Sequence, residues 1–178
     1  MATDGQTDID WPLMQNQVEE YFGDPTGSDF ANNYIQKFHL GELAGIFGHV
    51  NGMNGFEVNY VMADPLLSAL KKVADKGLAR AIHSFDGCWV IKQMKGDANM
   101  RSMHSWGLAI DLNAASNPFG GTPTWPKEFV LCFSQSGFEW GGLWQPDSMR
   151  DGMHFQLPWI RVRTGELAPV CWRPRANS

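Results

Sequence analysis

Apolar side chains recur at helical spacing in three segments of this chain. The clearest segment starts at Asp64-Pro65, where Asp64 can cap the first turn and proline fits the position after it, and it ends at Gly77. A second helix is predicted over Lys127 to Ser136, before Gly137. A shorter one is predicted over Gln15 to Tyr21.

Shorter apolar runs predict strands. Residues Leu108 to Leu112 and Met153 to Leu157 have the length and composition of buried strands. Residues 79–90 are strand-like with a break at Asp86-Gly87, and residues 30–62 are predicted to be loop with one or two short strands. Helices and strands in this irregular order predict an α+β fold, a small antiparallel sheet with flanking helices.

The 178 residues suffice for one domain with a real core. We expect a flexible N-terminus over residues 1–10, a single domain over residues 11–160, and a basic tail over residues 161–178 that carries four arginines on the surface. Eight tryptophans and nineteen glycines favour a loop-rich fold, in which the tryptophans either line a groove or pack in the core.

Charge and cysteine content exclude several classes of protein. The net charge of −5, with no long basic run, argues against a nucleic-acid binder. Three widely spaced cysteines do not form a disulfide framework, so a reducing cytoplasm suits the chain best. The first ten residues lack the pattern of a signal peptide, and no apolar run is long enough to span a bilayer.

Two short segments carry the residues of a catalytic metal site. His104 and Asp111 lie in the first segment, and His154 lies in the second. Two histidines and one carboxylate can hold a zinc ion and leave one position open for water. Gly107 offers the bend that brings His104 and Asp111 to one ion, and Asp151, three residues before His154, is placed to accept a proton from that water.

Several other side chains are candidates with an ordinary structural explanation. His39, His49 and His83 have no evident partner and are expected to be structural. Glu139, in an aromatic and glycine-rich segment, is the alternative to Asp151 as general base, although no local spacing ties it to a ligand. The chemistry also needs a cation or a backbone donor for the developing oxyanion.

The motif resembles that of the M15 zinc peptidases, which include D-alanyl-D-alanine carboxypeptidases and phage L-alanyl-D-glutamate endopeptidases. The resemblance covers most of residues 11–157 and is strongest over residues 85–156, where the chain is similar to phage and prophage lysins. It implies the small α+β fold shared with the zinc-binding domain of hedgehog proteins. The positions that carry it are Ser102, His104, Gly107, Ala109, Asp111, Asp151 and His154.

By this resemblance, His104, Asp111 and His154 bind Zn²⁺ and Asp151 is the general base. Lys92 stands where the family usually has an arginine that steadies the oxyanion or a substrate carboxylate, and lysine lacks the bidentate fork. Arg101 or Arg80 could replace it. Ser102, Arg101 and Trp106 are the expected substrate contacts, although Ser102 could equally be a turn residue.

The resemblance implies an endolysin-like peptidase that cuts the stem peptide of bacterial peptidoglycan. We expect a monomer, made in the cytoplasm of a host bacterium and later released to the wall. Two alternatives stay open. One is a D,D-carboxypeptidase that releases terminal D-alanine. The other is a non-catalytic zinc module that binds the wall or belongs to a virion.

Overall fold

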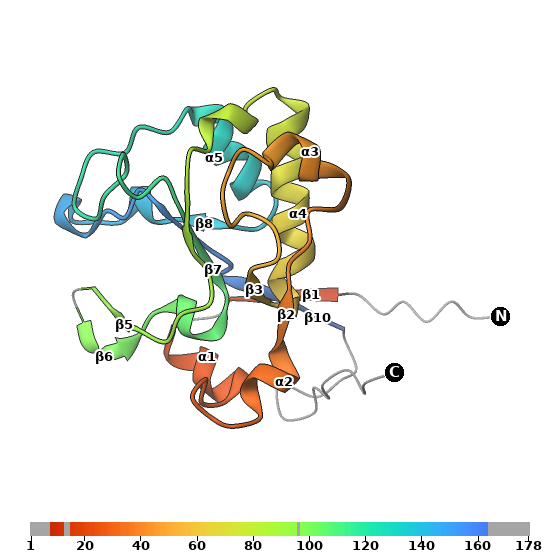
Figure 1. The fold of residues 1–178 in the computed structure, drawn as a ribbon. Helices are drawn as coiled ribbons and strands as arrows, with labels where there is room; N and C mark the ends of the chain where they lie inside the picture. Colours follow the sequence, from red (N-terminus) through yellow and green to blue (C-terminus); the bar gives the residue numbers. More distant parts are fainter. Residues whose placement is uncertain (1–7, 13–14, 96, 164–178) are drawn as a thin grey trace.

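The fold is a mixture of α-helices and short antiparallel strands, as Figure 1 shows. This computed structural model describes residues 8–12, 15–95 and 97–163. The predicted α+β class with small antiparallel sheets is confirmed. The helices are α1 (Gln15–Phe22), α2 (Phe30–Tyr34), α3 (Ala44–Phe47), α4 (Tyr60–Asp75) and α5 (Lys127–Ser134). The strands are β1 (Asp8–Pro12), β2 (Ile35–Lys37), β3 (Glu57–Asn59), β4 (Phe85–Gly87), β5 (Gln93–Met94), β6 (Asp97–Arg101), β7 (Ala109–Leu112), β8 (Glu139–Trp140), β9 (His154–Gln156) and β10 (Trp159–Arg163).

A four-stranded antiparallel sheet carries both segments of the predicted metal site. Its strand order is β4-β7-β9-β8. The pairing of β7 with β9 sets Asp111 opposite His154 and Ile110 opposite Phe155. Side chains alternate across a sheet, so the first pair faces the site while the second, fully buried, faces the apolar core. Both predicted strands are confirmed, to within one residue at each end.

Helix α4 begins five residues earlier than predicted. Its N-cap is Asn59, whose side chain accepts a backbone N–H of the first turn at 3.2 Å, and Asp64 lies within the helix. Pro65 also lies inside the helix, so the expected start at these two residues was wrong. Asn59 donates its side-chain amide to the carbonyl of Trp106 and its backbone N–H to that of Gly107, both at 3.0 Å. The start of α4 is therefore tied to the segment that carries His104.

The other two predicted helices are confirmed as α1 and α5, with small shifts at their ends. Gly137, three residues after α5, takes a φ of +93°, which supports its expected role in stopping the helix. Helix α5 packs against α4 and against β8. Phe129 and Phe133 are the fully buried residues of its apolar stripe.

Residues 30–62 contain more helix than predicted. The expected strands are β2 and β3, which pair with each other, but α2, a 3-10 turn at Gly41–Leu43 and α3 occupy much of the rest. These helices have four or five residues, too few for a 3.6-residue period to show in the sequence. Their buried residues, Phe30 and Phe47, anchor them in the core.

Over residues 79–90 the expected strand was mostly wrong. A 3-10 turn forms at Ala79–Ala81, and only Phe85–Gly87 pairs with β7. The pairing register with β7 shifts between Phe85 and Gly87, and Gly87 has a φ of +133°, so the regular hydrogen-bond ladder ends there.

Strands β1 and β10 pair with each other along five residues, from Asp8↔Arg163 to Pro12↔Trp159. The boundaries expected at residues 10 and 160 fall inside this pair, so residues 8–10 are not a separate flexible segment and residues 161–163 join a sheet. The remainder of the predicted lead-in and tail, including Cys171, lies outside the described residues.

The buried core explains part of the aromatic content. Trp106 is 1% exposed, whereas Trp125 and Trp144 each line a cavity. Cys88 and Cys132 are buried free thiols. None of the described helices combines the length and apolar composition that crossing a bilayer requires.

Candidate active site

A short 3-10 turn brings His104 and Asp111 to the same place. Ser102 precedes this turn (Met103–Trp106), and its hydroxyl accepts the backbone N–H of His104 at 3.4 Å. Gly107 ends the turn with a φ of +68°, and the chain enters β7 directly. A Cβ atom at residue 107 would lie 2.7 Å from the backbone nitrogen of Asn59. Both the left-handed backbone and this close approach require glycine, and the predicted bend at Gly107 is confirmed.

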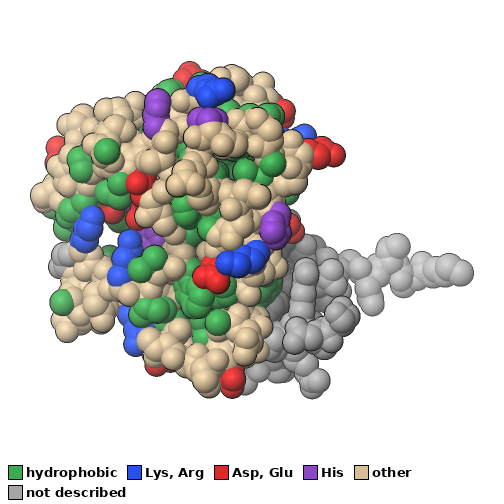
Figure 2. Space-filling view, in the orientation of Figure 1, with side chains coloured by type: hydrophobic (Ala, Val, Ile, Leu, Met, Phe, Trp, Pro, Cys, Tyr) green, Lys and Arg blue, Asp and Glu red, His purple; other side chains and the backbone are tan. Residues whose placement is uncertain are grey.

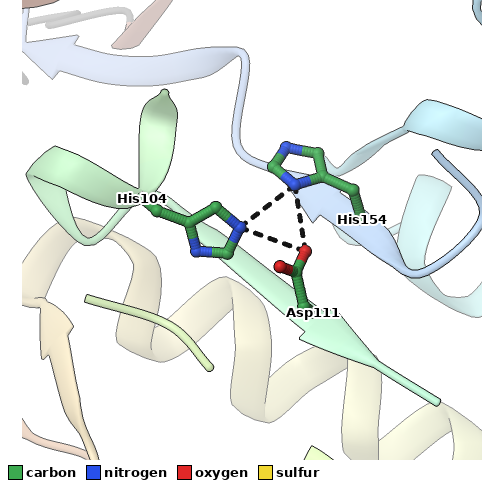
Figure 3. A group of neighbouring side chains, drawn as sticks. All are labelled: His104, Asp111 and His154. Atoms are coloured by element: carbon green, nitrogen blue, oxygen red, sulfur yellow. Dashed lines mark hydrogen bonds and ion pairs between the residues drawn. The ribbon is translucent and has the colours of Figure 1, made fainter. Parts of the chain in front are cut away.

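The side chains of His104, Asp111 and His154 point toward one another (Figure 3). Asp111 Oδ1 lies 3.0 Å from His104 Nε2 and 3.1 Å from His154 Nδ1, and the two nitrogens are 3.1 Å apart. All three residues are buried, with exposed fractions of 1%, 6% and 5%. Segments 43 residues apart along the chain thus meet in one triangle of ligand atoms.

The size of this triangle fits a zinc ion. Ligand atoms about 2.0–2.1 Å from a tetrahedral zinc lie roughly 3.3 Å from one another, close to the separations seen here. Two imidazoles and one carboxylate are also the donor types of a catalytic zinc site that keeps a fourth position open. His104, Asp111 and His154 are therefore able to hold such an ion together.

The electrostatics favour the protonation states that a metal needs. Burial raises the pKa of Asp111, but the two imidazoles beside its carboxylate outweigh burial and hold that pKa well below its usual range. Burial lowers the pKa of His104, so its imidazole is neutral at neutral pH. A carboxylate and a neutral imidazole are the ligand forms that bind zinc.

The outer nitrogen of each histidine is fixed by a hydrogen bond. His104 Nδ1 donates to the carbonyl oxygen of Cys88 at 2.6 Å, which leaves the lone pair of Nε2 directed at the site. His154 Nε2 donates to Gln156 Oε1 at 3.0 Å, which leaves the lone pair of Nδ1 directed at the site. The two histidines thus use opposite nitrogens as potential ligands.

Glu139 holds Gln156 in this role. Gln156 Nε2 donates to Glu139 Oε2 at 3.0 Å, so the amide oxygen of Gln156 is the atom that faces His154. The other oxygen of Glu139 accepts the indole N–H of Trp144 at 2.7 Å. The Trp144 ring centroid lies 5.3 Å from that of His154. Glu139 therefore orients Gln156, which in turn orients the imidazole of His154.

Asp151 lies beside the ligand triangle with one oxygen unused. Its Oδ1 is buried and has no hydrogen-bond partner among the described residues. Burial raises the pKa of Asp151, and the nearby Asp111 carboxylate adds to the rise. Its backbone is held firmly, because its N–H donates to the carbonyl of Gly141 at 3.0 Å and its carbonyl accepts the N–H of His154 at 3.1 Å. A carboxylate with a raised pKa and a free buried oxygen is suited to accept a proton.

A cavity opens over these groups between the β5–β6 hairpin and the segment around Trp144. Figure 2 shows Lys and Arg side chains beside a hollow on the left of the molecule, where a histidine is visible. The residues that line the cavity are Lys92, Gln93, Met94, Lys95, Ser102, His104, Asp111, Phe119, Trp144, Met149, Asp151, His154 and Gln156.

Residues 95–157 match the sequence model of a family described as D-alanyl-D-alanine carboxypeptidase, one of the M15 peptidases. All three potential ligands and Asp151 fall within the matched segment. Over this segment the chain is therefore similar to the M15 peptidases. Searches of curated proteins and of solved structures gave no match. The family match supports a peptidase, and the buried His-Asp-His cluster is a possible site for the zinc that is typical of M15 peptidases.

Lys92, expected near the site from the resemblance to M15 peptidases, lines the cavity. Its Nζ is 3.3 Å from Asp111 Oδ2, and 40% of its side chain is exposed. Arg101 instead pairs with Asp24 at 3.0 Å, and neither Arg101 nor Arg80 lines the cavity. Of these three candidates, the geometry thus puts Lys92 beside the ligands.

Two of the three expected substrate contacts are not at the cavity. Trp106 is buried, and its indole N–H donates to the carbonyl of Gly23 at 2.9 Å, so this residue belongs to the core. Arg101 is held by its ion pair with Asp24. Ser102 does line the cavity, and its hydroxyl also caps the turn of His104.

Sequence reasoning missed Gln156, Phe119 and Lys95. Gln156 follows His154 by two residues on the same strand, so the period of two would have placed it on the face of the site. Lys95 and Phe119 come together only through the fold, with Lys95 Nζ 5.2 Å from the ring centroid of Phe119. No local sequence signal connects those two residues.

Proposed function

We propose that the protein is a zinc-dependent peptidase that hydrolyses an amide bond in the stem peptide of bacterial peptidoglycan. The observation that carries this proposal is the unpartnered buried oxygen of Asp151 beside the triangle of His104, Asp111 and His154. A purely structural metal site has no use for such a carboxylate. The family match over residues 95–157 supports the same class of reaction.

Zinc bound at the three ligands would lower the pKa of a water molecule to about 7 and polarise the substrate carbonyl. Asp151 accepts the proton of the attacking water and returns it to the leaving amine. Lys92 supplies positive charge at the edge of the site, where negative charge develops on the carbonyl oxygen. Gln156 and Cys88 hold the two imidazoles in the tautomers that keep their inner nitrogens free.

An endolysin-like endopeptidase is our first choice of activity, because the segments over residues 85–156 are similar to those of phage lysins. The second candidate is a D,D-carboxypeptidase that releases terminal D-alanine. The description of the matched family favours this second candidate.

Digestion of purified sacculi by the zinc-loaded protein, followed by mass spectrometry of the products, separates these activities. A new N-terminus within the stem peptide would identify an endopeptidase and the bond it cuts. Free D-alanine as the sole product would identify a carboxypeptidase. Absence of product from several wall chemotypes, with zinc bound, would contradict both and indicate a wall-binding or virion module.

A further inference from the structure

A second pocket is lined by residues of the same loop that borders the active site. Its volume is about 480 Å³, within the usual range for a small-molecule site. The loop is formed by residues 113–126, between β7 and α5. Phe119 of this loop lines the active-site cavity and forms a β-bridge with Asp151, whereas Ser116, Thr124 and Trp125 of the same loop line the second pocket.

Trp125 gives this pocket a rigid aromatic wall. One face of its ring is stacked on Phe129, with centroids 4.1 Å apart and planes 7° apart. Its indole N–H donates to the carbonyl of Gly152 at 2.9 Å, so the ring is attached to the residue that follows Asp151. Trp125 is only partly buried, and its remaining exposed surface borders the pocket.

The rim of the pocket is polar and held in place by Asn113. Its side-chain oxygen accepts the backbone N–H groups of His83 and Ser84 at 2.7 and 3.0 Å, and its amide nitrogen donates to the carbonyl of Ala81 at 2.7 Å. The hydroxyls of Ser84 and Thr124 donate to other protein groups, and each keeps lone pairs that can accept a hydrogen bond.

The composition of the lining selects the class of ligand. Among the described residues, no Asp, Glu, Lys or Arg lines the pocket and His83 is its one titratable side chain, so little there offsets the desolvation of a charged ligand. An aromatic surface with hydroxyl acceptors around it instead suits a neutral molecule that has an apolar face and several hydroxyl donors. Saccharides have this combination.

We propose that this pocket binds a neutral saccharide unit of the glycan strand that carries the stem peptide. This inference rests on the proposed function, because it assigns the glycan and peptide parts of one substrate to two neighbouring sites. Binding of the glycan would place the attached peptide over Asp151 and lower KM for peptide that is still linked to glycan.

The test compares one stem peptide in two forms, attached to a short glycan and released from it by an amidase. The wild-type protein should show a higher kcat/KM on the attached form. Ala115 is exposed and lines the pocket, so Ala115→Trp should fill the pocket without disturbing Trp125. We expect the kcat/KM of this variant on the attached form to fall about tenfold through a higher KM, which corresponds to the loss of one aromatic contact with its hydrogen bonds. Its rate on the free peptide should be unchanged.

Asn32→Trp, at an exposed position of α2, is the matched control and should change neither rate. Titration with a tetramer of N-acetylglucosamine, followed by the NMR signal of the Trp125 indole N–H, tests the pocket without turnover. Equal wild-type rates on both peptides, together with no shift of that signal, would overturn the saccharide site and leave the proposed function intact. Failure to cut either peptide would count against the proposed function, while the titration would still decide the saccharide site.

Discussion

Gln156 should control the affinity of the site for zinc although it is not a ligand. It is 9% exposed and forms the link between His154 Nε2 and Glu139 Oε2, with both hydrogen bonds at 3.0 Å. Gln156→Leu keeps a side chain of similar volume and removes the acceptor. The N–H of His154 is then buried without a partner, and the imidazole is no longer fixed with Nδ1 toward the metal.

The size of the effect follows from this lost partner. Removing a hydrogen-bond partner of a metal-bound histidine typically weakens metal affinity about 10–100-fold, or roughly 1.4–2.7 kcal/mol. Leaving a buried N–H unsatisfied costs about 1–3 kcal/mol, which agrees with that range. The apo protein should lose a similar part of its free energy of unfolding, because the unpaired N–H is buried with or without zinc.

Zinc affinity is measured by competition with a fluorescent chelator, and urea unfolding of the apo form gives the stability. Gln93→Leu is the matched control, because Gln93 lines the same cavity but is exposed and makes no hydrogen bond to the three ligands. Its zinc affinity should equal that of the wild type. A Gln156→Leu protein that binds zinc within twofold of the wild type would refute the positioning role.

Three further results are expected. Gly107→Ala should lower the free energy of unfolding in urea by about 2–4 kcal/mol, because the added Cβ strains the left-handed backbone and would lie 2.7 Å from the nitrogen of Asn59. Gly23→Ala, at a φ of +77° with open space around it, should cost about 1 kcal/mol, and equal losses in the two variants would show that the close approach is unimportant. Lys92→Met should lower kcat at least tenfold while zinc content stays full, because Lys92 lies 3.3 Å from Asp111 at the edge of the site. Lys92→Arg should keep most of the wild-type kcat, and an unchanged kcat in Lys92→Met would show that this residue takes no part in the reaction. Chelation of zinc should lower Tm by roughly 10 °C, because a ligand at about 1,000 times its Kd adds about 4 kcal/mol to the free energy of unfolding of a domain of this size. An unchanged Tm in a calorimetric scan would argue against metal binding by the folded state.

The metal site could be predicted from sequence because its members lie in two short segments. Gly107 sets the bend between His104 and Asp111, and the β7–β9 register sets Asp111 opposite His154. The bend is local and visible in the sequence, whereas the register joins distant segments, and His154 was assigned to the same site through the chemistry of a zinc site and the resemblance to M15 peptidases. The residues of the outer layer were harder to find, since Glu139 reaches His154 only through Gln156.

The errors at helix and strand ends have one physical origin. Asn59 caps α4 because its side chain and backbone also bond to residues 106 and 107, which are far away in the chain. A local pattern favoured Asp64-Pro65 as the start, but this tertiary contact decided the cap. Likewise, β1 forms by pairing with β10, 147 or more residues later, and the sequence of neither segment indicates which segment it pairs with.

Asp151→Asn gives the most direct test of the proposed peptidase. Zinc content and turnover of one stem-peptide substrate should be measured on the same preparations of this variant and of the wild type. We expect both to bind one equivalent of zinc and the variant to lose turnover by about 10²–10⁴-fold, because it lacks the proton acceptor. A variant that turns over as fast as the wild type would contradict the role of Asp151, and a wild-type protein that binds no zinc would contradict the site itself.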